Sequence, residues 1–410
     1  MPETPPPGAE PLDPVPAPRV LLAGGGTAGH VNPLLATAAA LREPALGGRR
    51  EAGILVLGTA EGLEADLVPE AGFDMAVVPR VPMPRRPTGD LFMLPRRLSR
   101  AVGAAGEAIE AVDAQVVVGF GGYVSTPAYL AARRAGVPVV IHEQNARPGL
   151  ANRLGASWAA AVALTFASTP LRSSKGRTEV TGLPLRPAIG ELVARLAEPD
   201  GAAAARRAGA AALGLDPQAP TVLITGGSLG AQHLNEVLAA ALPSLSPDLQ
   251  VLHLTGRDKD GPVRAAVEAA VAAGADPGLA ERYHVLDYLV AMEQAYACAD
   301  GVICRSGAGT VAELTALGLP ALYVPLPIGN GEQRLNAADV VAAGGGRLVA
   351  DARLTAADVV DFTALLTRPA ERGAMAAAAA STGVRDGARR LADLIRTVAR
   401  EGSPSPRRKA

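Results

Sequence analysis

Val20-Leu21-Leu22-Ala23 runs directly into Gly24-Gly25-Gly26-Thr27-Ala28-Gly29-His30, and this stretch has a counterpart about 200 residues later. There, Val222-Leu223-Ile224-Thr225 runs into Gly226-Gly227-Ser228-Leu229-Gly230. Each stretch predicts a short apolar strand, a glycine turn and the start of an alanine-rich helix. Glycine lets the backbone approach a ligand closely, and a helix N-terminus offers unpaired N–H groups and a positive dipole end to an anion. The two loops therefore predict two phosphate-bearing ligands that face each other across a cleft.

The chain of 410 residues is too long for one ordinary core and fits two domains of roughly 150–200 residues each. We expect an α/β protein with two Rossmann-like, doubly wound domains that face a cleft at the carboxyl ends of their strands. The first domain is expected over residues 19–184 and the second over 185–385, with a last helix at about 386–400 that crosses back onto the first domain. The tails, 1–18 and 401–410, are rich in proline, serine or charge and are expected to be disordered.

Apolar strands alternate with helical patterns along both halves, which predicts right-handed βαβ units and parallel sheets. The expected strands are 19–23, 53–57, 75–78, 115–118, 139–142, 161–164 and 179–181 in the first half, and 221–225, 250–254, 283–285, 301–304, 321–324 and 346–348 in the second.

Composition argues against several classes of protein. The net charge of -1 and the aromatic content of 3% speak against nucleic-acid binding, which relies on positive charge and stacking platforms. No run of about 20 uncharged apolar residues could span a bilayer, and the acidic, proline-rich N-terminus lacks the features of a signal peptide. Cys298 and Cys304 are expected to be buried free thiols of a cytosolic protein rather than a disulfide.

The first glycine loop also fits the G-x-G-x-x-G pattern of a dinucleotide site. That interpretation requires an acidic residue about 20 positions further on, at the end of the second strand. Here the second strand ends at Leu57-Gly58-Thr59 without a carboxylate at its tip, and Glu61 comes late. His30 follows the loop at the start of the helix. It is either a polar capping residue or a base, because the helix dipole lowers the imidazole pKa and keeps the ring neutral.

Four further stretches place glycine turns or polar side chains at the ends of predicted strands. A run of polar side chains after a buried strand is costly unless it faces a wet cleft, so these stretches predict a binding site. They are Gly119-Phe120-Gly121-Gly122-Tyr123-Val124-Ser125, His142-Glu143-Gln144-Asn145, Cys304-Arg305-Ser306-Gly307-Ala308-Gly309-Thr310-Val311-Ala312-Glu313 and Pro325-Leu326-Pro327-Ile328-Gly329-Asn330-Gly331-Glu332-Gln333-Arg334-Leu335-Asn336.

Together and in this order, the motifs resemble the MurG family, the bacterial N-acetylglucosaminyltransferases that turn the undecaprenyl-linked precursor lipid I into lipid II. The resemblance covers about residues 19–400. It implies a GT-B fold, inversion at the anomeric carbon, and catalysis without a metal or another cofactor. It also implies UDP-GlcNAc as donor, lipid I as acceptor, and a peripheral protein on the cytoplasmic face of the cell membrane. Partners among the proteins of cell-wall synthesis and division are compatible with the family and are not specified by the sequence.

The resemblance assigns roles in the first domain by position. His30 falls where the family has its proposed base. Thr27, Ala28 and Gly29 match the loop that touches donor and acceptor, although the family often has glycine in place of Ala28. Asn145 matches the family asparagine near the sugar.

In the second domain, the resemblance implies that Ser228 meets the diphosphate, that Leu289 presents its backbone to uracil, and that Gln333 contacts the GlcNAc hydroxyls. Arg186 would reach the nucleotide diphosphate, and Glu313 would accept hydrogen bonds from the ribose. The implied donor-site segment comprises Ala308, Gly309, Thr310, Val311, Ala312 and Glu313, with Gly309 where the family frequently has a larger apolar residue.

Each of three assignments has a plainer alternative in the residues themselves. Ser228 is a residue type that commonly caps helices. Glu313 fits a solvated carboxylate near the start of a helix, and Arg186 fits a surface charge.

The implied mechanism is a direct displacement in which His30 takes the proton of the muramoyl C4 hydroxyl while UDP leaves. No Asp-x-Asp pair stands in a predicted cleft loop, and no His/Cys cluster has the spacing of metal ligands. Asp258-Lys259-Asp260 lies in a charged stretch and is expected to be a solvated loop.

A membrane-contact patch is predicted from Met83-Pro84-Arg85-Arg86 and Leu91-Phe92-Met93-Leu94-Pro95-Arg96-Arg97-Leu98-Ser99-Arg100, where apolar residues are flanked by five arginines. Apolar insertion combined with arginine attraction gives reversible binding to an anionic membrane surface. The alternative is an ordinary helix start with solvated arginines. Trp158 belongs either to this patch or to the core.

Three other functions fit the same two-domain plan. They are a glycosyltransferase with a soluble or glycolipid acceptor, a non-hydrolysing sugar epimerase, and a nucleotide-sugar-binding regulator without turnover. The motifs His142-Glu143-Gln144-Asn145 and Phe120-Gly121-Gly122-Tyr123 count against the first alternative. Acceptor transfer with release of UDP would distinguish the MurG-like function from the other two.

Overall fold

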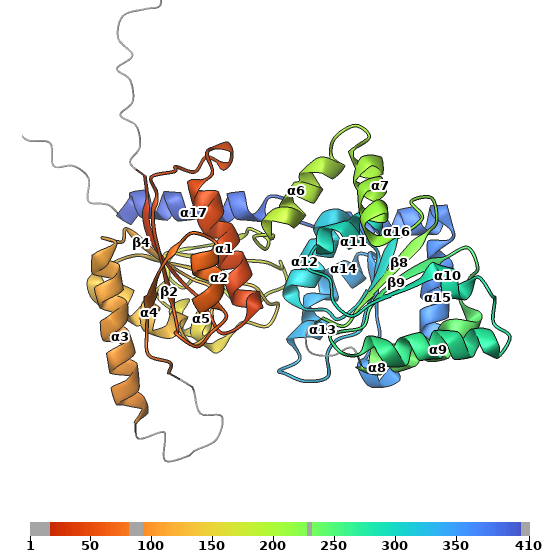
Figure 1. The fold of residues 1–410 in the computed structure, drawn as a ribbon. Helices are drawn as coiled ribbons and strands as arrows, with labels where there is room; N and C mark the ends of the chain where they lie inside the picture. Colours follow the sequence, from red (N-terminus) through yellow and green to blue (C-terminus); the bar gives the residue numbers. More distant parts are fainter. Residues whose placement is uncertain (1–16, 82–92, 228–231, 403–410) are drawn as a thin grey trace, which may run out of the picture.

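The computed structural model describes residues 17–81, 93–227 and 232–402, and these residues form two α/β domains side by side (Figure 1). The first sheet contains β1 (Arg19–Ala23), β2 (Gly53–Gly58), β3 (Asp74–Val77), β4 (Val116–Gly119), β5 (Val139–Glu143), β6 (Ala161–Leu164) and β7 (Arg177–Val180). The second contains β8 (Thr221–Thr225), β9 (Gln250–Leu254), β10 (Tyr283–Leu286), β11 (Gly301–Cys304), β12 (Ala321–Tyr323) and β13 (Gly346–Leu348).

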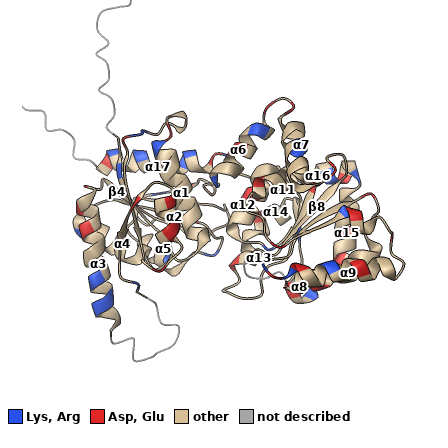
Figure 2. Cartoon of the chain, viewed as in Figure 1, with Lys and Arg blue, Asp and Glu red and all other residues tan. Residues whose placement is uncertain are grey.

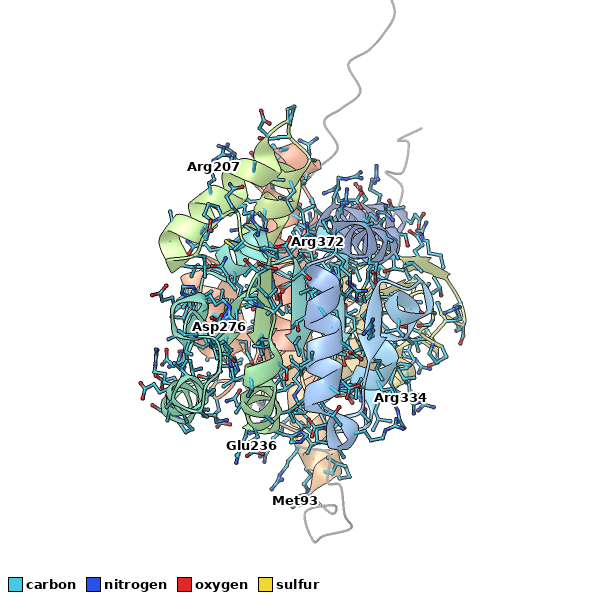
Figure 3. The ribbon with its side chains drawn as sticks, turned by 90° about the vertical axis from the view of Figure 1, so that its right-hand side faces the viewer. Met93, Arg207, Glu236, Asp276, Arg334 and Arg372 are labelled. Carbon is cyan, nitrogen blue, oxygen red and sulfur yellow. The ribbon has the colours of Figure 1, made fainter. Side chains whose placement is uncertain are left out.

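The strand orders are β3-β2-β1-β4-β5-β6-β7 and β10-β9-β8-β11-β12-β13, with every paired strand parallel. This arrangement confirms the expected pair of doubly wound domains. Because helices cover both faces of each sheet, the central strands are buried on both sides and consist of continuous apolar residues. Figure 3 shows this layering from the end of the second domain.

Helices fill the connections between the strands. In the first half they are α1 (Ala28–Arg42), α2 (Glu64–Glu70), α3 (Leu94–Ala111), α4 (Ser125–Ala135) and α5 (Leu150–Gly155). The second half holds α6 (Pro187–Leu196), α7 (Gly201–Leu213), α8 (Gln232–Ala241), α9 (Asp260–Ala272), α10 (Leu279–Arg282), α11 (Met292–Cys298), α12 (Ala308–Leu317), α13 (Glu332–Asn336), α14 (Ala338–Ala342), α15 (Ala356–Leu366), α16 (Pro369–Ser381) and α17 (Gly387–Gly402).

The last helix, α17, crosses back onto the first domain as expected. It contacts α1, β4 and β6, and it buries Leu391, Ile395 and Val398 in the same core as β1 (Figure 1). Glu401 and Gly402 still belong to this helix, so the expected C-terminal tail begins two residues too early. The rest of that tail and residues 1–16 lie outside the described residues.

Strand order reverses at one point in each sheet, and this reversal positions the site. In the first sheet the reversal lies between β1 and β4, and in the second between β8 and β11. At such switch points the loops that follow the two central strands leave in opposite directions and open a crevice for a ligand. The glycine turns after β1 and β4, and the turns after β8 and β11, therefore stand where ligands bind in this class of fold.

Two smaller expectations concern cysteine chemistry and membrane spans. Cys298 and Cys304 are both buried free thiols, as expected. Among the residues described, no helix combines the length and the hydropathy needed to cross a bilayer.

Candidate active site at the domain cleft

A cavity of about 700 Å³ lies at the carboxyl ends of the first sheet, within the size range of small-molecule pockets. Its wall includes the glycine turns after β1 and β4, together with Asn330 and Glu332 from the second domain. Of the residues predicted in the first domain, Thr27, His30 and Asn145 line it. Ala28 and Gly29 form the exposed first residues of α1 and are not part of its wall.

His30 is the third residue of α1, and its ring is held by the glycine turn. Thr27 Oγ1 lies 3.0 Å from Nδ1. Burial lowers the pKa of His30, whereas the nearby Gly25 carbonyl and the Glu64 carboxylate raise it, and burial prevails. The imidazole is therefore neutral near pH 7 and can accept a proton.

Glu64, the first residue of α2, was missed by the sequence reasoning. Its carboxylate accepts hydrogen bonds from Gly26 N–H at 2.8 Å, Thr59 N–H at 3.0 Å and Thr59 O–H at 2.7 Å. Burial raises the pKa of Glu64, but these hydrogen bonds outweigh it and hold the pKa below its usual value.

The expectation that no carboxylate stands at the tip of the second strand is therefore wrong, because the chain turns back after β2 and brings Glu64 there. A dinucleotide site would need this carboxylate open to a ribose. Here both of its oxygens are bound by the protein's own donors. The available signal was an acid two residues after Gly62, close behind the glycines that follow the second strand.

The polar turn after β5 is held rigidly by a buried carboxylate. Glu143 accepts from Asn145 N–H at 3.0 Å, Gly149 N–H at 2.9 Å and Asn152 Nδ2 at 2.9 Å. Burial raises the pKa of Glu143 although these donors oppose it. Across the cleft, Asn336 Nδ2 donates to the Asn145 side chain at 3.2 Å, which orients Asn145 at the cavity edge.

Contacts between the domains surround this turn. Asn336 Oδ1 accepts from Ala146 N–H at 2.8 Å, and the Arg147 guanidinium donates to the Asn330 carbonyl. The stretch that ends in Asn336 was singled out from the sequence, but its contact with the first domain depends on how the domains meet.

The second domain places Arg186 and Glu313 in direct contact. Arg186 Nε and Nη2 lie 2.9 and 3.3 Å from the Glu313 carboxylate, which also accepts from Tyr296 O–H at 3.0 Å. Glu313 is only 7% exposed, so the alternative of a solvated carboxylate is wrong, and Arg186 is paired rather than a free surface charge. Burial lowers the pKa of Arg186, but Glu313 outweighs it and raises the pKa above its usual value. No signal in the sequence pointed to Tyr296.

The structure places most of the remaining donor-site predictions. Helix α12 contacts both α6 and α13, which brings Gln333 into the same region, where its Oε1 accepts from Leu326 N–H at 3.0 Å. Leu289 follows β10 and packs partly against the core. Within the predicted segment Ala308–Glu313, Gly309 and Thr310 are half-buried and the others are buried. Ser228 lies outside the described residues.

Metal-ligating side chains do not gather at either switch point in the part of the chain described. No group of three or more His, Cys, Asp or Glu side chains suited to a metal ion occurs there. Asp260 is the first residue of α9 and not part of a loop as expected, and it pairs with Arg264 one helical turn later on the solvent side.

Known proteins identify the class of this molecule. Residues 20–164 match the glycosyltransferase family 28 N-terminal domain, and residues 221–391 match the glycosyltransferase family 28 C-terminal domain. The two sheets with a polar cleft between them have the GT-B architecture, so the protein is a glycosyltransferase of this class. The crystal structure of Acinetobacter baumannii MurG superposes on this chain with a TM-score of 0.70 and is 28% identical to it in sequence. The match covers 93% of this chain and 99% of the Acinetobacter chain.

Curated relatives narrow the class to one family. The UDP-N-acetylglucosamine--N-acetylmuramyl-(pentapeptide) pyrophosphoryl-undecaprenol N-acetylglucosamine transferase of Clavibacter michiganensis is 50% identical over 95% of this chain and 99% of its own length. The enzyme of the same name from Bifidobacterium longum is 51% identical over 82% of this chain and 86% of its own length. The chain belongs to the MurG family.

Other solved structures share the fold alone. The calicheamicin glycosyltransferase CalG4 has a TM-score of 0.61 at 17% identity, and the UDP-GlcNAc 2-epimerase of Neisseria meningitidis has 0.62 at 15%. These two correspond to the soluble-acceptor and epimerase alternatives, which the fold by itself does not separate from the MurG function.

Proposed function

We propose that this protein transfers GlcNAc from UDP-GlcNAc to the C4 hydroxyl of MurNAc in undecaprenyl-diphosphate-MurNAc-pentapeptide, forming lipid II with inversion, and that His30 is the general base. The observation that carries the proposal is a neutral, half-buried His30 in the wall of a cavity to which both domains contribute. The names of the curated relatives supply the donor and the acceptor.

The reaction is a single displacement at the anomeric carbon. His30 takes the proton of the C4 hydroxyl as that oxygen bonds to the anomeric carbon of GlcNAc. The bond from this carbon to the β-phosphate oxygen breaks at the same time, and UDP departs from the opposite face. General-base assistance of this kind contributes typically about 10²–10⁴-fold to the rate.

The second domain holds the donor in this proposal. The Glu313 carboxylate accepts from the ribose hydroxyls, and Arg186 turns from Glu313 toward the diphosphate when UDP-GlcNAc enters. Backbone N–H groups of the loop after β8, with Ser228, meet the negative charge that grows on the leaving diphosphate. The contact between Arg186 and Glu313 supports this assignment because it keeps both groups in one place before the donor binds.

The activity is tested with radiolabelled UDP-GlcNAc and a lipid I analogue, with and without EDTA. We expect labelled lipid product and UDP in equal amounts, at a rate that EDTA does not change. Formation of UDP-ManNAc from UDP-GlcNAc alone would identify an epimerase instead. Binding of UDP-GlcNAc without turnover would identify a regulator.

The pH dependence follows from the state of His30. The base works only when it is unprotonated, so kcat falls as the pH drops through the pKa of His30. Because burial lowers that pKa, we expect the midpoint of this fall below the ordinary value of 6.5. A pH–rate profile under saturating substrate measures it. A midpoint above 7 would contradict a buried, neutral base.

A membrane-facing surface surrounds one end of the cavity. Leu94 and Leu98 of α3 and Leu150 and Leu154 of α5 line the cavity, and Leu150 is 71% exposed. Met93 lies at the lower edge of the molecule (Figure 3), and the adjoining end of α3 carries arginines (Figure 2). An exposed apolar rim next to positive charge suits peripheral contact with an anionic bilayer that presents the lipid acceptor.

Two parts of the earlier membrane prediction have different outcomes. Phe92 and the residues before it lie outside the described residues, so their contribution stays a prediction. Trp158 packs against the core beneath Arg133, whose guanidinium carbon lies 5.0 Å from the centre of the indole ring. Trp158 is therefore a core residue.

Replacing Leu150 and Leu154 together with serine should weaken binding to anionic vesicles about tenfold or more, because two side chains lose their burial in the interface. Sedimentation with phosphatidylglycerol vesicles measures this change. Val180→Ser is the matched control, since Val180 is 42% exposed on β7 and lies outside the cavity wall. Equal binding by the double variant and the control would place the membrane contact elsewhere.

A further inference from the structure

The first glycine turn lies between two titratable side chains. The N–H of Gly26 donates to Glu64 Oε2 at 2.8 Å, and Thr27, the next residue, places its Oγ1 3.0 Å from His30 Nδ1. The turn therefore contacts a carboxylate on one side and the imidazole on the other.

We propose that Glu64 is a positioning residue for His30, which it supports by fixing the Gly26-Thr27 turn against which the imidazole lies. The inference rests on the proposed function, in which His30 is the general base.

The Glu64 carboxylate is held in a site that the fold builds for it. Its other oxygen, Oε1, accepts from both the N–H and the O–H of Thr59. A Cβ atom at Gly25 or at Gly62 would overlap the carboxylate, and one at Gly58 would lie 2.7 Å from Glu64 Cγ. Three glycines on two segments, the turn after β1 and the end of β2 with its following loop, thus leave room for this one side chain, which is fully buried.

This arrangement has a direct chemical consequence for the base. When Nδ1–H donates to Thr27 Oγ1, Nε2 is free to take the proton from the acceptor hydroxyl. Once that proton arrives, the imidazolium is stabilised by the negative charge of Glu64. An orienting carboxylate performs the same task in a Ser-His-Asp triad, where it contacts the histidine directly.

Other charged groups line the cavity, and their effects on the pKa of His30 must be distinguished from that of Glu64. Glu61, Arg80, Glu143, Arg147 and Glu332 all line the same space. Glu64 differs from them in its hydrogen bond to the turn that holds His30, and its charge is the one that raises the pKa of His30.

The test is Glu64→Gln, compared with Glu70→Gln as the matched control, because Glu70 is exposed at the far end of the same helix. Glutamine keeps the shape of Glu64, but its NH₂ group must face Gly26 N–H or Thr59. We expect kcat to fall about 10- to 100-fold, which is part of the usual general-base contribution, while KM for UDP-GlcNAc changes less than about twofold. The acid limb of the pH–rate profile should move to lower pH, because the charge that favours the imidazolium is gone.

A second readout does not depend on turnover. NMR titration of the full-length protein with labelled histidine should show a lower pKa for His30 in Glu64→Gln than in Glu70→Gln. Thr59→Val, which removes one of the hydrogen bonds to Glu64, should shift both readouts in the same direction by less. Identical His30 titration and kcat in Glu64→Gln and Glu70→Gln would overturn the proposal. Absence of lipid transfer by the unmutated protein would instead overturn the proposed function, while the titration would still decide the coupling.

Discussion

Replacing His30 with alanine should lower kcat about 10²–10⁴-fold and leave the affinity for UDP-GlcNAc within about twofold. The structure supports this split between turnover and binding. His30 lines the cavity of the first domain, whereas Arg186, just before α6, and Glu313, within α12, pair with each other and are not part of that cavity wall. The side chain therefore acts on the acceptor hydroxyl, and its loss removes an interaction made in the transition state.

The measurement combines single-turnover kinetics on a lipid I analogue with calorimetric titration of UDP-GlcNAc. Unchanged donor affinity serves as the internal control for folding. A variant that keeps near-normal turnover would remove His30 as the base. A variant that loses donor binding as well would show that the two switch points are not separate sites.

The second large effect is expected at Glu313. Glu313→Gln should weaken UDP-GlcNAc binding about 100-fold, or roughly 3 kcal/mol, because it removes the charged hydrogen-bond acceptor for the ribose hydroxyls. Tyr296→Phe removes a single hydrogen bond to the same carboxylate and should weaken binding only about fivefold.

Calorimetric titration of UDP-GlcNAc measures both changes. Glu191→Gln is the matched control, since Glu191 is an exposed acid on α6, a few residues from Arg186. The assignment of Glu313 to the donor site fails if Glu313→Gln binds UDP-GlcNAc as tightly as Glu191→Gln does.

The strands were predictable because parallel strands covered by helices on both sides must be apolar along their whole length. The expected range 221–225 coincides with β8, and 161–164 coincides with β6. The edge strand β7 was placed two residues late, because Arg177-Thr178-Glu179-Val180 is partly exposed and its composition does not distinguish it from a loop. Edge strands lose the apolar signal on which such a prediction depends.

Only part of the candidate site could be read from the sequence. Glycine turns directly after strands are local features, so His30 and its loop were found. Glu64 and Tyr296 act through contacts with residues 38 and 17 positions away in the chain, and those contacts depend on the paths of α2 and α11. Residue type and spacing carry no information about such returns of the chain, so both residues were missed.

The passage of α17 back to the first domain means that the backbone crosses between the domains twice, and the two crossings touch. A side chain at Gly182, in the first crossing, would overlap Val384 in the second, and Gly387 leaves similar room for the Leu183 carbonyl. Two connecting segments that pack against each other at one edge allow the domains to rotate about that edge. They hinder sliding or twisting of one domain against the other. Any opening about that edge would withdraw Asn336 from Asn145, so that parting of the two halves and loosening of the acceptor pocket are one mechanical event.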